Sequence, residues 1–113
     1  MIDPIEIRKT ILKILYKAGA SHLGSGMSVV EILISMFSSV DINKIIEHSN
    51  NRSRIIISKG HCAAATYATM AHFGIIPFEI LKTYHQNDSM LAGHVSRPRP
   101  IGFSFYICTI YLK

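Results

Sequence analysis

Apolar residues recur at helical spacing in the first part of the chain. Asp3 and Pro4 are typical of a helix start, because an aspartate side chain accepts exposed backbone N–H groups and proline suits the first helical position. Gly19 is expected to end this helix, since glycine commonly follows the last helical residue. The spacing predicts one buried face, made of Ile7, Ile11, Ile14, Leu15 and Ala18.

A polar loop and a second helix are expected next. Residues 20–26, with the sequence ASHLGSG, predict a flexible loop. Ser28 and Glu31 fit a capping box, in which both side chains bind backbone donors at a helix start. Residues 41–53 are rich in asparagine and predict a connection with a turn of helix around Ile45. The apolar stripe of the second helix is expected to consist of Ile32, Leu33, Met36 and Phe37.

Residues 54–74, RIIISKGHCAAATYATMAHFG, change character twice. Arg54–Ile57 predicts a buried strand, because β-branched residues fill it without polar alternation. Cys62–Phe73 is rich in alanine and predicts a helix, which Gly74 is expected to cap. A polar corner of four residues joins the strand to the helix; it consists of Ser58, Lys59, Gly60 and His61.

This corner has the composition of an anion-binding site. In an open α/β sheet, ligands bind beyond the carboxyl ends of the strands. The N-terminal amides of the following helix favour a phosphate or diphosphate there. Gly60 allows the backbone to approach the ligand closely, while Lys59 or His61 can donate to the anion. The alternative for a single histidine after a strand is a structural hydrogen bond.

The remainder of the chain is less regular. Pro77 is expected to start a short helix that carries Phe78, Leu81 and Tyr84. The prolines within Arg97–Pro100 are expected to block regular structure. The final run, FSFYICTIYLK, is aromatic and β-branched and predicts a strand, which would promote aggregation as an exposed edge.

The composition describes one globular domain. The chain has 113 residues, of which 49% are apolar and 17% are charged. Its net charge of +5 would suit a phosphate-bearing ligand, although a small excess of lysines also serves solubility. The basic residues are scattered and form no nucleic-acid-binding motif, so no nucleic-acid partner is expected.

The cysteines and the N-terminus indicate in which cellular compartment the protein works. Cys62 and Cys108 make neither a disulfide framework nor a metal-ligand pair, so Cys62 is expected to be a buried thiol in a reducing cytosol. The N-terminus lacks the apolar core of a signal peptide, and no stretch approaches the ~20 apolar residues of a membrane helix. A cytoplasmic chain with no membrane partner is therefore expected.

Segments in a fixed order resemble the N-terminal part of transketolase. They are AGASHLGSGMSVVEIL, then RSRIIISKGHCAAATYATMAHFG, then a helix started by proline, and then NDSMLAGHVS. The resemblance covers roughly residues 5–96 and is greatest for the short N-terminal sections that work with a separate C-terminal chain. It implies an α/β fold, the N-terminal part of the thiamine diphosphate-binding fold. In that fold an open, mostly parallel sheet is flanked by helices; here it is expected to be incomplete and mostly helical.

The resemblance also implies an activity and a cofactor. Transketolases transfer a two-carbon ketol unit between sugar phosphates, using thiamine diphosphate held through a divalent cation, usually Mg²⁺. By resemblance, two catalytic residues are expected: His22 at the substrate mouth near the reactive carbon, and His94 as a proton shuttle. His61, with Gly60 and Lys59 of the same corner, would bind the cofactor near its diphosphate. Imidazoles suit proton transfer because near pH 7 they both give and take a proton.

The other histidines have no such motif around them. No two histidines have the helical spacing and partner of a zinc site. Solvated or helix-face positions are expected for His48, His72 and His85.

After residue 96 the sequence departs from the family pattern. The glycine-aspartate-glycine motif, whose aspartate binds the metal in the family, is absent, and so is the glutamate of the family's second domain. The expected organisation is therefore a partial domain over residues 1–96, without metal ligands, followed by a divergent apolar tail over residues 97–113. Truncation or a frameshift would produce such a tail.

These features leave several functions open. The first expectation is a transketolase-like fragment that is not active alone. One alternative is a subunit of a split transketolase, completed by a C-terminal-section chain or by a homodimer. The others are a non-catalytic module that binds an anion or a metal, and a pseudogene product.

Overall fold

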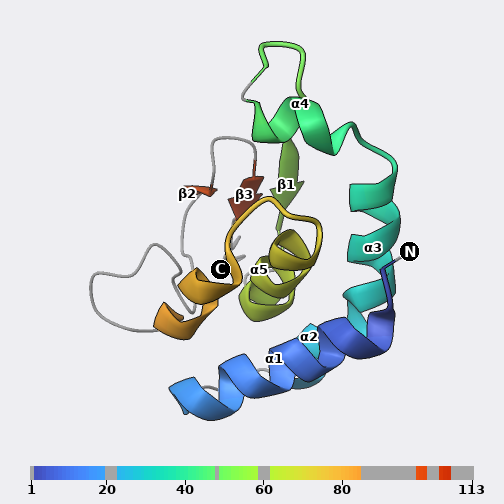
Figure 1. Cartoon of the computed structure of the whole chain (residues 1–113). Helices are drawn as coiled ribbons and strands as arrows, with labels where there is room; N and C mark the ends of the chain where they lie inside the picture. The colour runs from blue at the N-terminus through green and yellow to red at the C-terminus, as the bar shows by residue number, and fades with distance from the viewer. Residues whose placement is uncertain are drawn as a thin grey trace, which may run out of the picture.

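Most of the described residues are helical, and several helices pack around a central one. The elements in chain order are α1 (Pro4–Ala18), α2 (Leu23–Ser28), α3 (Val30–Ser38), α4 (Ile42–Ile46), β1 (Ile55–Ile57), α5 (Ala63–His72), the 3-10 helix η2 (Phe78–Thr83), β2 (Arg99–Ile101) and β3 (Phe105–Ile107). This computed structural model describes residues 2–19, 23–47, 49–58, 62–84, 99–101 and 105–107. Figure 1 shows α5 in the middle, with α1 and α2 below it and α3 to its right.

The first helix forms as its sequence predicts. The Asp3 carboxylate accepts a hydrogen bond from the Ile5 backbone N–H at 2.9 Å, and Pro4 occupies the first turn. Gly19 follows the helix in the left-handed conformation, with φ of 63°. Ala18 is only half-buried. The rest of the predicted face is buried, namely Ile7, Ile11, Ile14 and Leu15.

The predicted loop and capping box after α1 are wrong where the structure describes them. Residues 23–26, expected in a flexible loop, belong to helix α2, and residues 20–22 lie outside the described part. Ser28 is the last residue of α2, and its hydroxyl donates to the Ser25 carbonyl at 3.1 Å. Helix α3 starts after Val29, which makes no side-chain capping bond.

Glu31, the expected partner in that box, binds a residue far away in sequence. Its Oε2 accepts a hydrogen bond from Nη2 of Arg8 at 2.7 Å, and the same nitrogen donates to the Met27 carbonyl at 3.0 Å. The Arg8 hydrogen bond lowers the pKa of the Glu31 carboxyl. This arginine therefore joins α1 to both α2 and α3, a contact that local spacing does not reveal.

The apolar stripe of α3 differs from the prediction at one position. Ile32 is 64% exposed, so its inclusion in the buried stripe is wrong. Val30 is fully buried and lies on the same helical face as the predicted pair Leu33 and Phe37. The turn of helix expected around Ile45 is confirmed as α4.

Helix α5 is buried along all of its length except the last residue, His72. It contacts α1, α2, α3 and η2, and every residue from Ala63 to Ala71 is buried. Small side chains occur where the helices pack: a Cβ on Gly26 of α2 would make ordinary contacts, at 3.5 Å from Ile11 and 3.8 Å from Ala65. The two polar side chains are satisfied within the helix, because Thr66 donates to the Cys62 carbonyl at 3.0 Å and Thr69 to the Ala65 carbonyl at 2.8 Å.

The described strands form a small mixed sheet in the order β1-β3-β2. β1 pairs with β3 in parallel, and β2 pairs with β3 in antiparallel. The predicted strand in the final run is thus confirmed over Phe105–Ile107, and it lies between the other two strands, away from the sheet edge. The prediction that the prolines prevent regular structure is wrong for Arg99–Ile101. These residues form β2, and Pro100 is tolerated there because β2 lies at the edge of the sheet.

This arrangement confirms a mostly helical structure. β1 is buried on one face only, because Ile55 and Ile57 are buried while Ile56 is 69% exposed. The extensive parallel sheet implied by the family resemblance stays a prediction. Within the described residues, no helix is long and apolar enough to span a membrane.

The end of α5 turns the chain back against the helix. Gly74 has a φ of 79°, its N–H donates to the Ala71 carbonyl at 3.1 Å, and the N–H of Ile75 donates to the Met70 carbonyl at 2.9 Å. This pair of bonds is a Schellman motif and confirms Gly74 as the cap. η2 then follows Pro77, as predicted, and its residue Leu81 is buried.

Replacing Gly74 with alanine is expected to lower the free energy of unfolding by about 1 kcal/mol, because a Cβ is disfavoured at positive φ. The matched control is Gly24→Ala: Gly24 lies within α2, where a new Cβ meets nothing within 4 Å. That variant should be neutral or slightly stabilising. Urea unfolding followed by circular dichroism measures both, and equal losses for the two variants would contradict the assigned cap.

Candidate functional site

The predicted anion-binding corner lies between the carboxyl end of β1 and the first turn of α5. Ser58 follows β1 and is exposed, and α5 begins at Ala63. The strand and the helix on the two sides of the corner are therefore confirmed. The three residues predicted to bind the cofactor, Lys59, Gly60 and His61, lie outside the described residues.

The first turn of α5 is held from inside the protein. Cys62 is fully buried, as predicted, and its carbonyl accepts the Thr66 hydroxyl at 3.0 Å. The Cys62 sulfur also lies 3.8 Å from the Thr66 hydroxyl oxygen. The Cys62 side chain makes no capping hydrogen bond, so the backbone N–H groups of the first turn depend on other acceptors. A phosphate oxygen is an acceptor suited to a helix N-terminus.

The two predicted catalytic histidines also lie outside the described residues, as do His48 and His85. His22 immediately precedes Leu23, the first residue of α2, and α2 contacts α5. His94 has no described neighbour in sequence. The described residues therefore do not include any of the five predicted site residues, and the roles of these five residues stay predictions.

The described residues include a backbone arrangement that fits a diphosphate. The strand end and the helix N-terminus provide the backbone arrangement that binds phosphate. A divalent cation such as Mg²⁺ prefers carboxylate and carbonyl oxygens. Within the described part of the chain, no three histidine, cysteine, aspartate or glutamate side chains come close enough to hold a metal ion.

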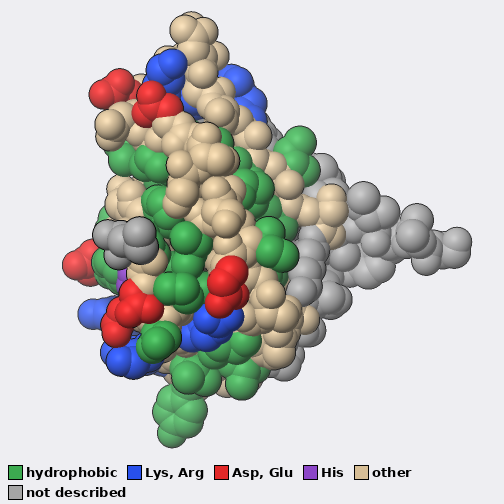
Figure 2. All heavy atoms as spheres, turned by 90° about the vertical axis from the view of Figure 1, so that its right-hand side faces the viewer, with side chains coloured by type: hydrophobic (Ala, Val, Ile, Leu, Met, Phe, Trp, Pro, Cys, Tyr) green, Lys and Arg blue, Asp and Glu red, His purple; other side chains and the backbone are tan. Residues whose placement is uncertain are grey.

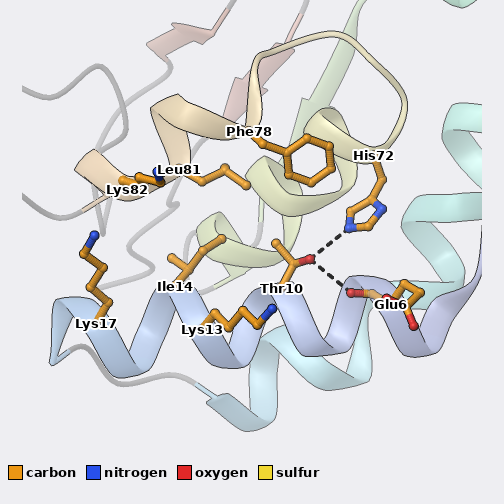
Figure 3. Close-up of a pocket in the computed structure, with 9 residues that line it drawn as sticks. All are labelled: Glu6, Thr10, Lys13, Ile14, Lys17, His72, Phe78, Leu81 and Lys82. Carbon is orange, nitrogen blue, oxygen red and sulfur yellow. Dashed lines mark hydrogen bonds between the residues drawn. The ribbon is translucent and has the colours of Figure 1, made fainter.

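A separate cavity lies at the other end of α5, where sequence patterns gave no prediction. It has a volume of about 490 Å³ and opens between α1, the end of α5 and η2 (Figure 3). The lining residues are Glu6, Thr10, Lys13, Ile14, Lys17, His72, Phe78, Leu81 and Lys82. The lining residues from α1 recur three or four positions apart, so they lie on one face of this helix. This mostly polar face, next to the buried one, is the feature of the sequence that could have indicated the cavity.

His72 lies on a helix face, as predicted, but it is partly buried in this cavity. Its Nε2 lies 2.9 Å from Oγ1 of Thr10, and that hydroxyl donates to the Glu6 carbonyl at 3.0 Å. With the hydroxyl hydrogen directed to Glu6, this contact suits the tautomer of His72 that carries its hydrogen on Nε2. Burial lowers the pKa of His72, and the nearby Glu6 carboxylate opposes this shift. The ring of Phe78 packs edge-on against the imidazole, with 5.0 Å between ring centroids.

Comparison with known proteins gives a consistent family. Residues 5–101 match the family described as transketolase, thiamine diphosphate binding domain. The chain is 34% identical over 99 residues to the 6-deoxy-6-sulfo-D-fructose transketolase subunit SqwG of Clostridium sp. (strain MSTE9). The aligned region covers 85% of this chain and 35% of that protein. No solved structure matched the chain.

Two further relatives are also named as subunits. An apulose-4-phosphate transketolase subunit of Phocaeicola vulgatus is 34% identical over 90 residues, covering 77% of this chain and 31% of that protein. The protein of the same name from Actinobacillus succinogenes is 38% identical over 88 residues, covering 77% and 32%. The chain thus spans about one third of the length of these relatives.

Thr66→Val is expected to loosen the corner while keeping the side-chain shape. Loss of the bond to the Cys62 carbonyl should cost about 1 kcal/mol. It should also speed reaction of Cys62 with a thiol reagent up to about fivefold, because the first turn opens more easily. Cys108→Ser serves as the background for the measurement.

Thr69→Val is the matched control for this experiment. Thr69 is equally buried and makes the same kind of bond, but its acceptor is Ala65, inside the helix. It should lower the free energy of unfolding by a similar amount without exposing Cys62 more. Equal acceleration by both variants, or rapid reaction of Cys62 in the parent chain, would contradict this account of the corner.

Proposed function

Because the chain belongs to the transketolase family through its thiamine diphosphate binding domain, we propose that it takes part in transfer of a two-carbon ketol unit between sugar phosphates. It does so as one subunit of a split transketolase and is inactive alone. The observation that carries this proposal is the match over residues 5–101, which spans the strand, the corner and the buried helix that follows it.

The corner after β1 is the proposed binding site of the cofactor's diphosphate. Gly60 allows close backbone approach, and Lys59 and His61 supply positive charge or N–H donors. The buried, tightly packed α5 supports this role, because it fixes the direction of the first-turn amides. The Mg²⁺ ion that accompanies the diphosphate would be held by carboxylate or carbonyl oxygens together with the phosphate oxygens.

The chain's histidines are proposed to handle protons. When bound, thiamine diphosphate supplies the electron sink for breaking and forming the carbon–carbon bond. His22 and His94 hold and move protons at the substrate's hydroxyl and carbonyl oxygens. Neutral imidazole suits this task, because near pH 7 it both donates and accepts.

An exposed apolar surface supports the proposed partner chain. Ile5, Leu12 and Tyr16 of α1 are 60%, 48% and 92% exposed and lie on one side of the helix, away from the core. Ile32 of α3 is also exposed. Figure 2 shows apolar side chains on the face formed by α3 and the start of α1, beside charged ones. Clustered apolar side chains on a surface mark contact sites for other polypeptides, and the relatives compared above are named as subunits.

Reconstitution with the product of a neighbouring gene tests this function. The chain alone, with thiamine diphosphate and Mg²⁺, is expected to show no ketol transfer and no sub-micromolar cofactor binding by calorimetry. Addition of a C-terminal-section chain should restore transfer from a ketose phosphate to an aldose phosphate.

Variants of the chain separate the proposed site from the rest of the protein. His61→Ala should lower the reconstituted rate at limiting thiamine diphosphate about tenfold, the effect of losing one hydrogen bond to a charged phosphate oxygen. His48→Ala, in the connection before β1, should leave the rate unchanged. Activity of the lone chain would contradict the need for a partner. Full activity of the His61 variant would contradict the proposed site.

A further inference from the structure

The cavity at the end of α5 is separate from the proposed cofactor corner. His72, the last residue of α5, lines it, whereas the corner precedes the first residue, Ala63. The two are separated by a helix of 10 residues, which is about 15 Å long. Ketol transfer at the corner makes no use of this cavity.

Positive charge dominates the cavity. Lys13 and Lys17 come from α1 and Lys82 comes from η2, and Figure 3 shows Lys17 extending from α1 in the direction of η2. Within the described part of the chain, neither Lys13 nor Lys17 makes an ion pair. Glu6 is the carboxylate among the lining residues, and it is already paired with Lys9 at 3.2 Å. The electrostatic environment therefore favours an anion.

The other walls are apolar. Ile14 and Leu81 are each only 6% exposed, and the ring of Phe78 lies beside them in the cavity. These side chains offer no hydrogen-bond partner, and the nearby Thr10 hydroxyl already bonds to the Glu6 carbonyl and to Nε2 of His72. A sugar placed here would bury hydroxyl groups against carbon without partners, which is costly. An apolar group would be stabilised by the same contact.

We propose that this cavity binds a small organic anion whose phosphate or carboxylate group is held by Lys13 and Lys17 and whose apolar body packs on Ile14, Phe78 and Leu81. The ligand class is that of aryl and branched-chain phosphates and carboxylates, and it excludes sugar phosphates. The site goes beyond the proposed ketol transfer, and its occupancy does not depend on thiamine diphosphate.

Titration of the isotope-labelled full chain with phenyl phosphate tests the proposal. The amide resonances of His72, Phe78 and Leu81 are expected to shift with a single dissociation constant. The ring resonances of His72 and Phe78 should shift with the same constant. Inorganic phosphate and glucose 6-phosphate are the comparison probes, the first lacking an apolar body and the second carrying a polar one. Both should bind at least about fivefold more weakly, the equivalent of losing one favourable apolar contact.

Matched variants locate the site. Lys17→Gln should raise the dissociation constant of phenyl phosphate about fivefold, the size expected for a partly exposed charge pair. Lys44→Gln removes the same charge from α4, away from the cavity, and should change nothing. Phe78→Ala should weaken binding of phenyl phosphate but not of inorganic phosphate.

Several results would overturn the proposal. They are the absence of saturable shifts in the cavity residues, equal affinity for the three probes, and equal weakening by Lys17→Gln and Lys44→Gln. Each outcome is independent of ketol transfer, because the readout needs neither the cofactor nor a partner chain. Failure of the proposed ketol transfer would leave the result of this titration unchanged.

Discussion

Burial of α5 from Ala63 to Ala71 is the constraint on which the rest of the structure depends. Four other helices contact it, and its residues from Ala63 to Ala71 are buried. A helix enclosed on all sides needs small side chains if its neighbours are to pack at native density. The alanines meet this need, and Gly26 of α2 packs beside Ala65 and Ile11. The hydroxyls of Thr66 and Thr69 cost little, because each donates to a carbonyl of α5 itself or its N-cap residue.

Both proposed sites are located by this helix. Its first turn lies next to the corner after β1, and its last residue, His72, lines the cavity with the lysines. The Schellman motif at Gly74 then reverses the chain so that η2 packs on α5 and forms one wall of that cavity. A rigid support of this kind is what a binding site requires, because small displacements of the surrounding groups weaken ligand binding. The exposed apolar side of α1 faces away from α5 and is available to another polypeptide.

Local signals in the sequence predicted local structure well. The caps Asp3, Gly19 and Gly74 were predicted because the chemistry of each lies within a few residues of the helix end it serves. The capping box failed because Glu31 binds Arg8, which is 23 residues away, and no local spacing encodes that choice. Ile32 and Ile56 were expected to be buried and are exposed, because apolar composition does not say which side of an element meets the core.

The predicted site residues show the same division between local and long-range information. The ordered segments around His22, His61 and His94 were sufficient to predict the family, and the match over residues 5–101 confirms it. They predict the roles of those histidines, but the structure does not describe these positions. The lysine-lined cavity was not predicted, because Lys13, His72 and Lys82 come together only when α1, α5 and η2 pack.

Amide hydrogen exchange in the native chain tests the central role of α5 most directly. If α5 is the helix that the others enclose, its amides from Thr66 to Met70 should exchange only through global unfolding, with the largest protection in the chain. The amides of α1 should exchange through smaller, local openings, since one side of that helix faces solvent. Faster exchange in α5 than in α1 would show that the enclosing packing does not hold, and would contradict the account of both sites.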